Sequence, residues 1–236
     1  MPKLKRLAIA TLVSVLACPG VASPQDGRRA LLLVVDDLHI EFRSTPGTRE
    51  LMRKVLGMLF REGDSVAIIS TGSSSVAVAP TSNVARLTSG LSRITGGGLK
   101  PNQILDPEWA DERLSRAKIA IAAARDAIRV VASRVAGPVV VLYFSGGYAE
   151  QSLAPDLAEL ASDAYRANAT IYAFDSRLVG RPLSSPSAGN ESAWESHLRE
   201  ARESLNGLAE STGGRLVSAA GEFDAALADI AQRANR

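Results

Sequence analysis

Five short apolar runs recur along the chain, and each has the length and composition of a β-strand. They read LLLVV (31–35), SVAII (65–69), VVVLYF (139–144), TIYAF (170–174) and RLV (215–217). Continuous apolar runs, as opposed to alternating ones, are typical of strands buried on both faces of a parallel sheet. A sixth run, SVAVAP at 75–80, follows the second run after the turn TGSS, which predicts an antiparallel edge strand.

Helical patterns separate these runs. Residues 48–62 repeat apolar positions at Leu51, Val55, Leu56 and Leu59, and residues 112–135 keep the same spacing. The alternation of strand and helix predicts an α/β fold. We expect a doubly wound, mostly parallel central sheet with one antiparallel edge strand and helices on both faces.

Two irregular segments, at 95–111 and 176–192, are rich in Gly, Pro and Ser and are longer than a structural connection needs. In a doubly wound sheet, ligands bind outside the carboxyl ends of the strands. Asp36, Ser145 and Asp175 are each expected at such an end. For Asp175, a turn cap is the alternative to a binding role.

The first residues have the features of an export signal. A basic stretch (1–6) precedes an apolar stretch (7–17) too short to span a bilayer and a small-residue stretch (18–23). This pattern predicts a signal peptide over 1–23, one domain over 28–234, and a periplasmic or extracellular location. Because Cys18 follows VLA, the alternative is a lipoprotein signal ending before Cys18, with a lipid anchor as the only membrane attachment.

Composition narrows the chemistry further. Cys18 is the only cysteine, so the exported domain can form neither an internal disulfide nor a cysteine metal site. Without Lys3, Lys5 and Arg6, the 27 basic residues fall to 24 against 25 acidic ones, a net charge of −1. This balance gives no support to nucleic-acid binding.

Several stretches, in their order and spacing, resemble a von Willebrand factor type A (VWA) domain of the VWFA-related kind found in secreted bacterial proteins. They are LLLVVD, the long helix leading to VVVLYFSGG, then ANATIYAFDSR, LAESTGGRLV and EFDAALADIAQR. The resemblance covers roughly residues 28–234. It implies a protein-binding module whose central sheet carries a metal-ion-dependent adhesion site, where a divalent cation bridges to an acidic side chain of a partner protein. The identity of that protein partner is not encoded in the resemblance.

The metal-binding motif of the family is incomplete in this chain. Its first loop, D-x-S-x-S, is matched by Asp36, Leu38 and Ile40, so two hydroxyl ligands are replaced by apolar side chains. Mg²⁺ needs a near-octahedral set of oxygens, which Leu and Ile cannot supply.

The later motif of the family, T-D-G, is matched by Ser145, Gly146 and Gly147, so its carboxylate is missing. The resemblance leaves Asp36, Thr95 and Ser145 as the residues of a degenerate site. We therefore expect no resident cofactor and at most weak Mg²⁺ or Mn²⁺ binding.

Other interpretations of the loop after the first strand stay open. Asp37, His39 and Glu41 alternate, so in an extended chain they face one side and form a nonstandard Zn²⁺ or Mn²⁺ site. In a loop they are solvated residues. Asp36 itself is alternatively a loop cap that accepts backbone N–H groups near Ser145, with Asp37 solvated beside it. Asp37, His39, Gly146 and Asp175 are also candidates for contacts with a partner.

Two catalytic interpretations are weaker. VVDD resembles the start of a receiver domain, but no Asp and Lys pair follows at the later strand ends. Ser145 is placed as in a hydrolase, but its turn lacks the G-x-S-x-G pattern. His197 is expected on the solvated face of a charged helix and not in a catalytic site. We expect a binding module that is not an enzyme.

Overall fold

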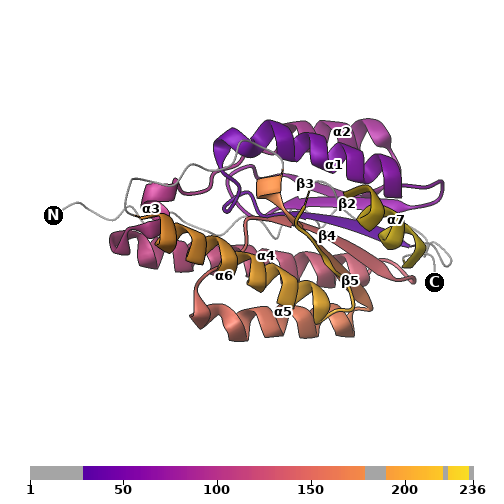
Figure 1. Ribbon diagram of the computed structural model, residues 1–236. Coiled ribbons are helices and arrows are strands. Elements are labelled where there is room, and N and C mark those ends of the chain that lie inside the picture. The colour runs from indigo at the N-terminus through magenta and orange to yellow at the C-terminus, as the bar shows by residue number, and fades with distance from the viewer. Residues whose placement is uncertain (1–28, 179–189, 220–222, 234–236) are drawn as a thin grey trace.

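A computed structural model of the chain describes residues 29–178, 190–219 and 223–233. The predicted signal peptide with Cys18 lies outside these residues, and so does most of the second irregular segment. The described residues form one sheet in the order β3-β2-β1-β4-β5-β6, with helices on both sides (Figure 1).

The predicted strands are all present. Their bounds are β1 (Ala30–Val35), β2 (Ser65–Ser70), β3 (Ala77–Thr81), β4 (Val139–Ser145), β5 (Ala169–Asp175) and β6 (Leu216–Val217). β1 pairs in parallel with β2 and β4, and β5 pairs in parallel with β4 and β6. Only the pair of β2 and β3 is antiparallel among the described strands. The predicted doubly wound α/β fold, with a mostly parallel sheet and one antiparallel edge strand, is confirmed.

The apolar run of β1 is continuous because both faces of the strand are covered. Leu31, Leu33 and Val35 point into one hydrophobic core, and Ala30, Leu32 and Val34 point into the other. Successive side chains of a strand face opposite ways, so a strand between two helical layers needs an apolar residue at each position.

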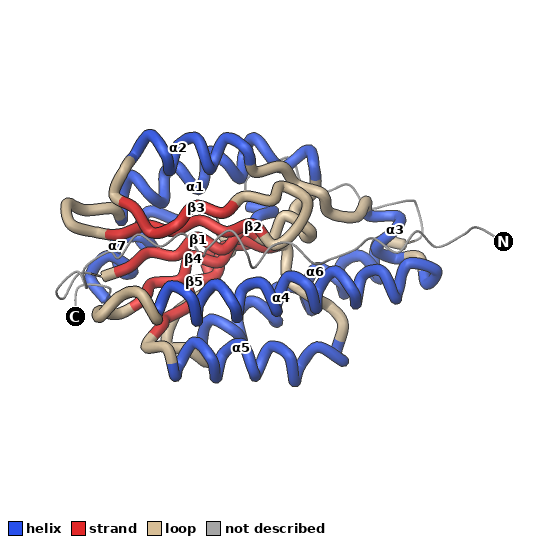
Figure 2. Tube along the Cα trace, turned by 180° about the vertical axis from the view of Figure 1, so that it is seen from behind, coloured by secondary structure: helices blue, strands red, loops and turns tan. Residues whose placement is uncertain are grey.

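Helices cover both faces of the sheet, as Figures 1 and 2 show from opposite sides. On one face lie α1 (Thr45–Leu59), α2 (Val84–Arg93) and α7 (Phe223–Arg233). On the other lie α4 (Ala110–Ala132), α5 (Ala154–Arg166) and α6 (Glu191–Glu210). Among the described residues, no helix combines the length and apolarity needed to cross a membrane.

The first irregular segment is more regular than its composition indicates. It contains the short helix α3 (Pro101–Leu105) and the 3-10 turn η3 (Pro107–Trp109). A proline at the start of each favours helix formation there, because the backbone N–H at the first helical position makes no hydrogen bond within the helix. Three further 3-10 turns follow strands or loops: η2 (Phe42–Ser44), η4 (Gln151–Leu153) and η5 (Ser176–Leu178).

Both edge strands of the sheet are short or irregular. β3 contains Pro80, and its register with β2 shifts between Val66 and Ile68. β6 has only two residues. A proline has no N–H for a ladder and is therefore confined to such edges.

Candidate functional site

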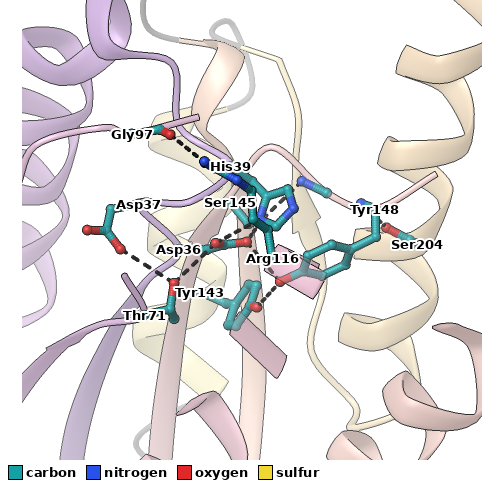
Figure 3. A network of polar contacts seen from close by, with 11 residues as sticks. Asp36, Asp37, His39, Thr71, Gly97, Arg116, Tyr143, Ser145, Tyr148 and Ser204 are labelled. Carbon is teal, nitrogen blue, oxygen red and sulfur yellow. Dashed lines mark hydrogen bonds and ion pairs between the residues drawn. The ribbon is translucent and has the colours of Figure 1, made fainter. Parts of the chain in front are cut away.

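The centre of the candidate site is the carboxylate of Asp36, which directly follows β1 and has no solvent exposure. Four side chains contact it (Figure 3). One oxygen, Oδ2, accepts hydrogen bonds from Ser145 Oγ at 2.7 Å and Tyr148 OH at 2.8 Å. The other, Oδ1, lies 2.9 Å from His39 Nδ1 and accepts from Thr71 Oγ1 at 3.2 Å.

These contacts saturate the carboxylate, because two carboxylate oxygens offer about four acceptor positions. Burial by itself raises the pKa of Asp36, but the charge and hydrogen bond of His39, with the hydroxyls of Ser145 and Tyr148, bring it below its usual value. Asp36 is therefore an ionised, buried group that ties together the loops after β1, β2 and β4.

The network continues inward through two tyrosines. The Tyr148 hydroxyl donates a hydrogen bond to Asp36 and is also hydrogen-bonded to the hydroxyl of Tyr143, on β4. Burial, followed by the charge of Asp36, raises the pKa of both phenols well above the usual value. Both tyrosines are therefore neutral donors at physiological pH, which is the state that the carboxylate requires.

Asp36 does act within the loop architecture, but its partners are side chains and not the backbone N–H groups expected from the sequence. Ser145 links Asp36 to the backbone indirectly. Its hydroxyl donates to the Asp36 carboxylate and accepts from the backbone N–H of Gly147 at 3.0 Å.

The prediction that Asp37 is solvated is wrong. Its side chain is buried, and Oδ2 accepts the backbone N–H of Ser74 at 2.7 Å. Burial raises the pKa of Asp37, although hydrogen bonds from Ser74 act in the opposite direction. The loop after β2 folds over this carboxylate, which the apolar-to-acidic boundary in the sequence does not reveal.

The structure brings together only two of the three residues of the degenerate metal site. Asp36 and Ser145 are hydrogen-bonded, whereas the Thr95 hydroxyl accepts from Arg49 Nη2 at 3.3 Å. The backbone of Thr95 is bound to Ser74 instead. The threonine that reaches Asp36 is Thr71, which follows β2 and was missed in the sequence.

This arrangement does not fit the Mg²⁺ ion that the family resemblance implies. The acceptor positions of Asp36 already receive protein donors, and Ile40 is packed in the core at 1% exposure. At Gly146, where the family has an acid, an added Cβ would lie 2.5 Å from the carbonyl oxygen of His39. A carboxylate side chain therefore has no space at that position.

The glycine run at 96–98 also has a structural explanation. A Cβ at Gly96 would lie 2.4 Å from the carbonyl oxygen of Ile40, so only glycine allows the two loops to touch. Gly97 N donates to Asp37 O at 2.7 Å, and Gly98 N donates to Ile40 O at 2.9 Å. The run thus clamps the loop that carries Asp36.

The nonstandard metal set is not assembled. β1 ends at Val35 and the chain then turns, so Asp37, His39 and Glu41 do not share one face. Nowhere in the described ranges do three or more His, Cys, Asp or Glu side chains group as metal ligands. His39 instead orients one ring nitrogen toward Asp36 and lies edge-on to Tyr148, with ring centroids 4.9 Å apart.

Asp175, the last residue of β5, has the capping contacts that the sequence analysis gave as one alternative. Its Oδ1 accepts the backbone N–H of Arg177 at 3.0 Å, and both carboxylate oxygens bind the Arg177 guanidinium at 2.7 and 2.8 Å. The pair fixes the turn that leaves the sheet after β5.

A small pocket lies at the carboxyl edge of the sheet, beside the Asp36 network. Its volume is about 60 Å³. The loops after β1 and β4, the α3 region and the first turns of α4 and α6 contribute side chains, among them His39, Ile104, Arg113, Glu150, Trp194 and His197. The pocket holds a few water-sized groups but not a nucleotide or a similar cofactor, which needs about 300 Å³ or more.

The expectation of a solvated His197 is wrong. The ring is half-buried, lines the pocket and stacks on Trp194, with centroids 5.5 Å apart and planes at 14°. Burial is the main cause that lowers its pKa to about 4, so the imidazole is neutral at physiological pH. Glu150 opposes this shift, and the charges of Arg177 and Arg113 strengthen it.

Phe42 is an exposed aromatic residue on a loop that helps to line this pocket. Phe42 belongs to η2, between the pocket-lining residues Glu41 and Ser44, and 67% of its surface is exposed. The neighbouring Ile40 is in contrast fully packed. The sequence EFRS at 41–44 does not reveal this exposure, because it contains no pattern that separates an exposed ring from a buried one.

The comparisons with known proteins add little to these observations. No family model and no curated protein matches the sequence. The chain is similar to a solved structure described as the crystal structure of the TFIIH p34 N-terminal domain, with 14% sequence identity and a TM-score of 0.49, over 89% of this chain and 99% of that chain. A likeness of this size says nothing about function.

Proposed function

We propose that this chain is an exported, VWFA-related protein-binding module that recognises another protein through the loops at the carboxyl edge of its sheet. The basic and apolar pattern of residues 1–23 supports export to the periplasm or beyond, free or anchored at Cys18. Recovery of exported protein that still carries Met1 would contradict removal of the signal.

The observation that carries this proposal is the exposed ring of Phe42, on the loop whose residues Glu41 and Ser44 line the small pocket. Large exposed aromatic side chains are enriched at the centres of protein interfaces, where they bury much area at a low entropic cost. The loop that presents Phe42 is held by Asp36 at its start and by the glycine run along its length. A rigid loop loses little conformational freedom when a partner binds, which favours affinity.

Replacing Phe42 with alanine should weaken capture of the partner at least about tenfold, the effect of losing one anchor residue. The folded state should change little, because the ring is mostly exposed. The immobilised mature protein and the variant are compared in pulldowns from envelope extract, with the captured protein identified by mass spectrometry and titrated.

The matched control is Tyr165→Ala. Tyr165 is also an exposed aromatic residue, at 80%, but it lies near the end of α5, which leads into the amino end of β5. This variant should capture the partner as the unaltered protein does. Equal loss from both variants, or from neither, would refute a binding surface at the carboxyl edge.

We also propose that the module works without tight metal binding. The saturated carboxylate of Asp36 and the packed Ile40 support this, since a cation would have to displace protein donors. Mg²⁺ should bind no tighter than about 10 mM, so at about 10 mM it should stabilise the fold by at most roughly 0.4 kcal/mol in urea denaturation. A much larger Mg²⁺ or Mn²⁺ effect that Asp36→Asn removes would show a functioning metal site.

The pair of Asp36 and His39 resembles the acid and base of a hydrolase, yet we propose a binding role. A nucleophile has to lie within hydrogen-bond reach of such a base. In the described residues, no serine, threonine or tyrosine hydroxyl is hydrogen-bonded to His39. The hydroxyls of Thr71, Ser145 and Tyr148 all donate to Asp36 instead.

A further inference from the structure

The indole N–H of Trp194 is a buried donor whose partner is missing. Trp194 lies in the first turn of α6 with 4% of its surface exposed, and it lines the small pocket. Its Nε1 atom has no hydrogen-bond partner in the part of the chain that the structure describes. Buried polar groups are rarely left in this state, and each exception needs a cause, such as a ligand that completes the bond.

The missing partner must be an acceptor, because an indole N–H can only donate. The neighbouring His197 ring is stacked on the indole and presents its face to it, so it does not satisfy the N–H. Trp194 lines the pocket, but its Nε1 atom is buried, so the indole ring has to move before a ligand oxygen in the pocket can accept from the N–H.

The pocket has more donors than Trp194. Arg113 lines it and uses two of its five N–H groups, donating Nε to Glu150 at 3.1 Å and Nη1 to the carbonyl oxygen of Asp106 at 2.9 Å. Arg116 and Arg177 also line the pocket, where Arg116 is paired with Glu112 and Arg177 with Asp175.

The charges of the lining favour a negative ligand. The pocket is lined by three arginines, Arg113, Arg116 and Arg177, and by two glutamates, Glu41 and Glu150, so positive charge is in excess. The neutral His197 ring adds no charge to the pocket, and its nitrogens can orient a ligand by donating or accepting a hydrogen bond. Size sets the other limit, since about 60 Å³ admits a carboxylate with a methylene or two.

We propose that this pocket binds a carboxylate group, with the indole N–H of Trp194 and the unused N–H groups of Arg113 as donors, and that the partner protein supplies it as an Asp or Glu side chain. The second half rests on the proposed function, whereas carboxylate binding itself does not. Three apolar residues of the lining, Leu99, Ile104 and Leu198, then pack on the methylene groups of the entering side chain.

The test uses Trp194 as its own reporter. The chain has two tryptophans, and Trp109→Phe leaves Trp194 as the sole indole without touching the pocket lining. Acetate, titrated at pH 7 and constant ionic strength against chloride, should change the emission of Trp194 in a saturable way, with a Kd below about 100 mM for a ligand of four non-hydrogen atoms. Acetamide and inorganic phosphate are titrated in parallel and should bind more weakly.

Variants assign the donors. Arg113→Gln, in the Trp109→Phe background, should weaken acetate binding about tenfold, as expected for the loss of a charged donor. Trp194→Phe keeps a ring but removes the N–H and should weaken binding measured by calorimetry. Arg53→Gln is the matched control, because Arg53 is paired with Glu50 on α1 and does not line the pocket. Urea denaturation of each variant separates weaker binding from loss of the fold.

Each outcome has a separate meaning. No saturable response to acetate, an equal response to acetamide, or tighter binding of phosphate would overturn the carboxylate site. If acetate binds but does not compete with the captured partner, the site stands and the acidic side chain of the partner is refuted. If Phe42→Ala leaves capture intact while acetate binds normally, the proposed function fails and the carboxylate site remains.

Discussion

Asp36→Ala should lower the free energy of unfolding by about 3–5 kcal/mol, because it removes a buried charge on which several donors depend. The hydroxyls of Ser145, Tyr148 and Thr71 lose their common acceptor in a site without solvent exposure. Asp36→Asn keeps the volume of the side chain and one acceptor oxygen. Its N–H₂ group, however, faces hydroxyl groups that donate hydrogen bonds to the carboxylate in the unaltered protein. It should therefore cost less, about 2 kcal/mol.

Urea denaturation followed by circular dichroism measures both effects. Asp126→Ala is the control, since Asp126 lies on α4 with 62% of its side chain exposed, and its loss should change stability by less than about 0.5 kcal/mol. A loss below about 1 kcal/mol for Asp36→Ala would mean that the network does not hold the loops together.

Gly147→Ala should have a comparable cost, about 3 kcal/mol or more, from two separate causes. Gly147 has a φ of +80°, which side-chain-bearing residues rarely adopt. An added Cβ would also lie 2.0 Å from the carbonyl oxygen of Ala201, on α6. The Gly147 N–H is bonded to the Ser145 hydroxyl. Moving the Gly147 backbone away from α6 would therefore disturb this hydrogen bond.

Two other glycines separate these causes in the same urea experiment. Gly213 has a φ of +79° but open space around its Cβ position, so Gly213→Ala should cost only about 1 kcal/mol. Gly57 is helical with open space, so Gly57→Ala should stabilise the protein by roughly 0.5–1 kcal/mol. A cost for Gly147→Ala equal to that for Gly213→Ala would show that the contact with α6 yields easily.

The architecture was predictable because local patterns of apolar and turn residues determine its strands and helices. Continuous apolar runs marked the strands between two helical layers, and the turn TGSS marked the antiparallel edge strand β3. The helices at 48–62 and 112–135 appear as α1 and α4, each beginning two or three residues earlier than the apolar spacing indicated. Proline within the first helical turn of α1 explains its early start.

The site was less predictable because its contacts join residues far apart in the chain. Asp36 and Ser145 could be placed together, since each stands at the carboxyl end of a neighbouring parallel strand. The same logic applies to Thr71, directly after β2, and would have favoured it over Thr95. The burial of Asp37 depends on how the loop at 72–74 folds, and no local pattern encodes that.

The pocket was missed for a related reason. The stretch AWESHLREARESL has the charge pattern of a solvated helix, yet its first turn packs against the loops at the carboxyl edge. Trp194 and His197 are three residues apart and so share one helix face, which was a usable signal. Only the position of α3 and Arg113 opposite them reveals that this face borders a cavity.

The way the sheet ends on either side bears on how this protein behaves when many copies are crowded together. An open strand edge invites another chain to add a strand, which is how sheets grow into fibrils. Here Pro80 and the register shift interrupt one edge, and the two residues of β6 make the other edge too brief to serve as a template. Strand addition between copies is thus disfavoured at both edges of the sheet. The molecule can therefore expose Phe42 without polymerising through its edge strands.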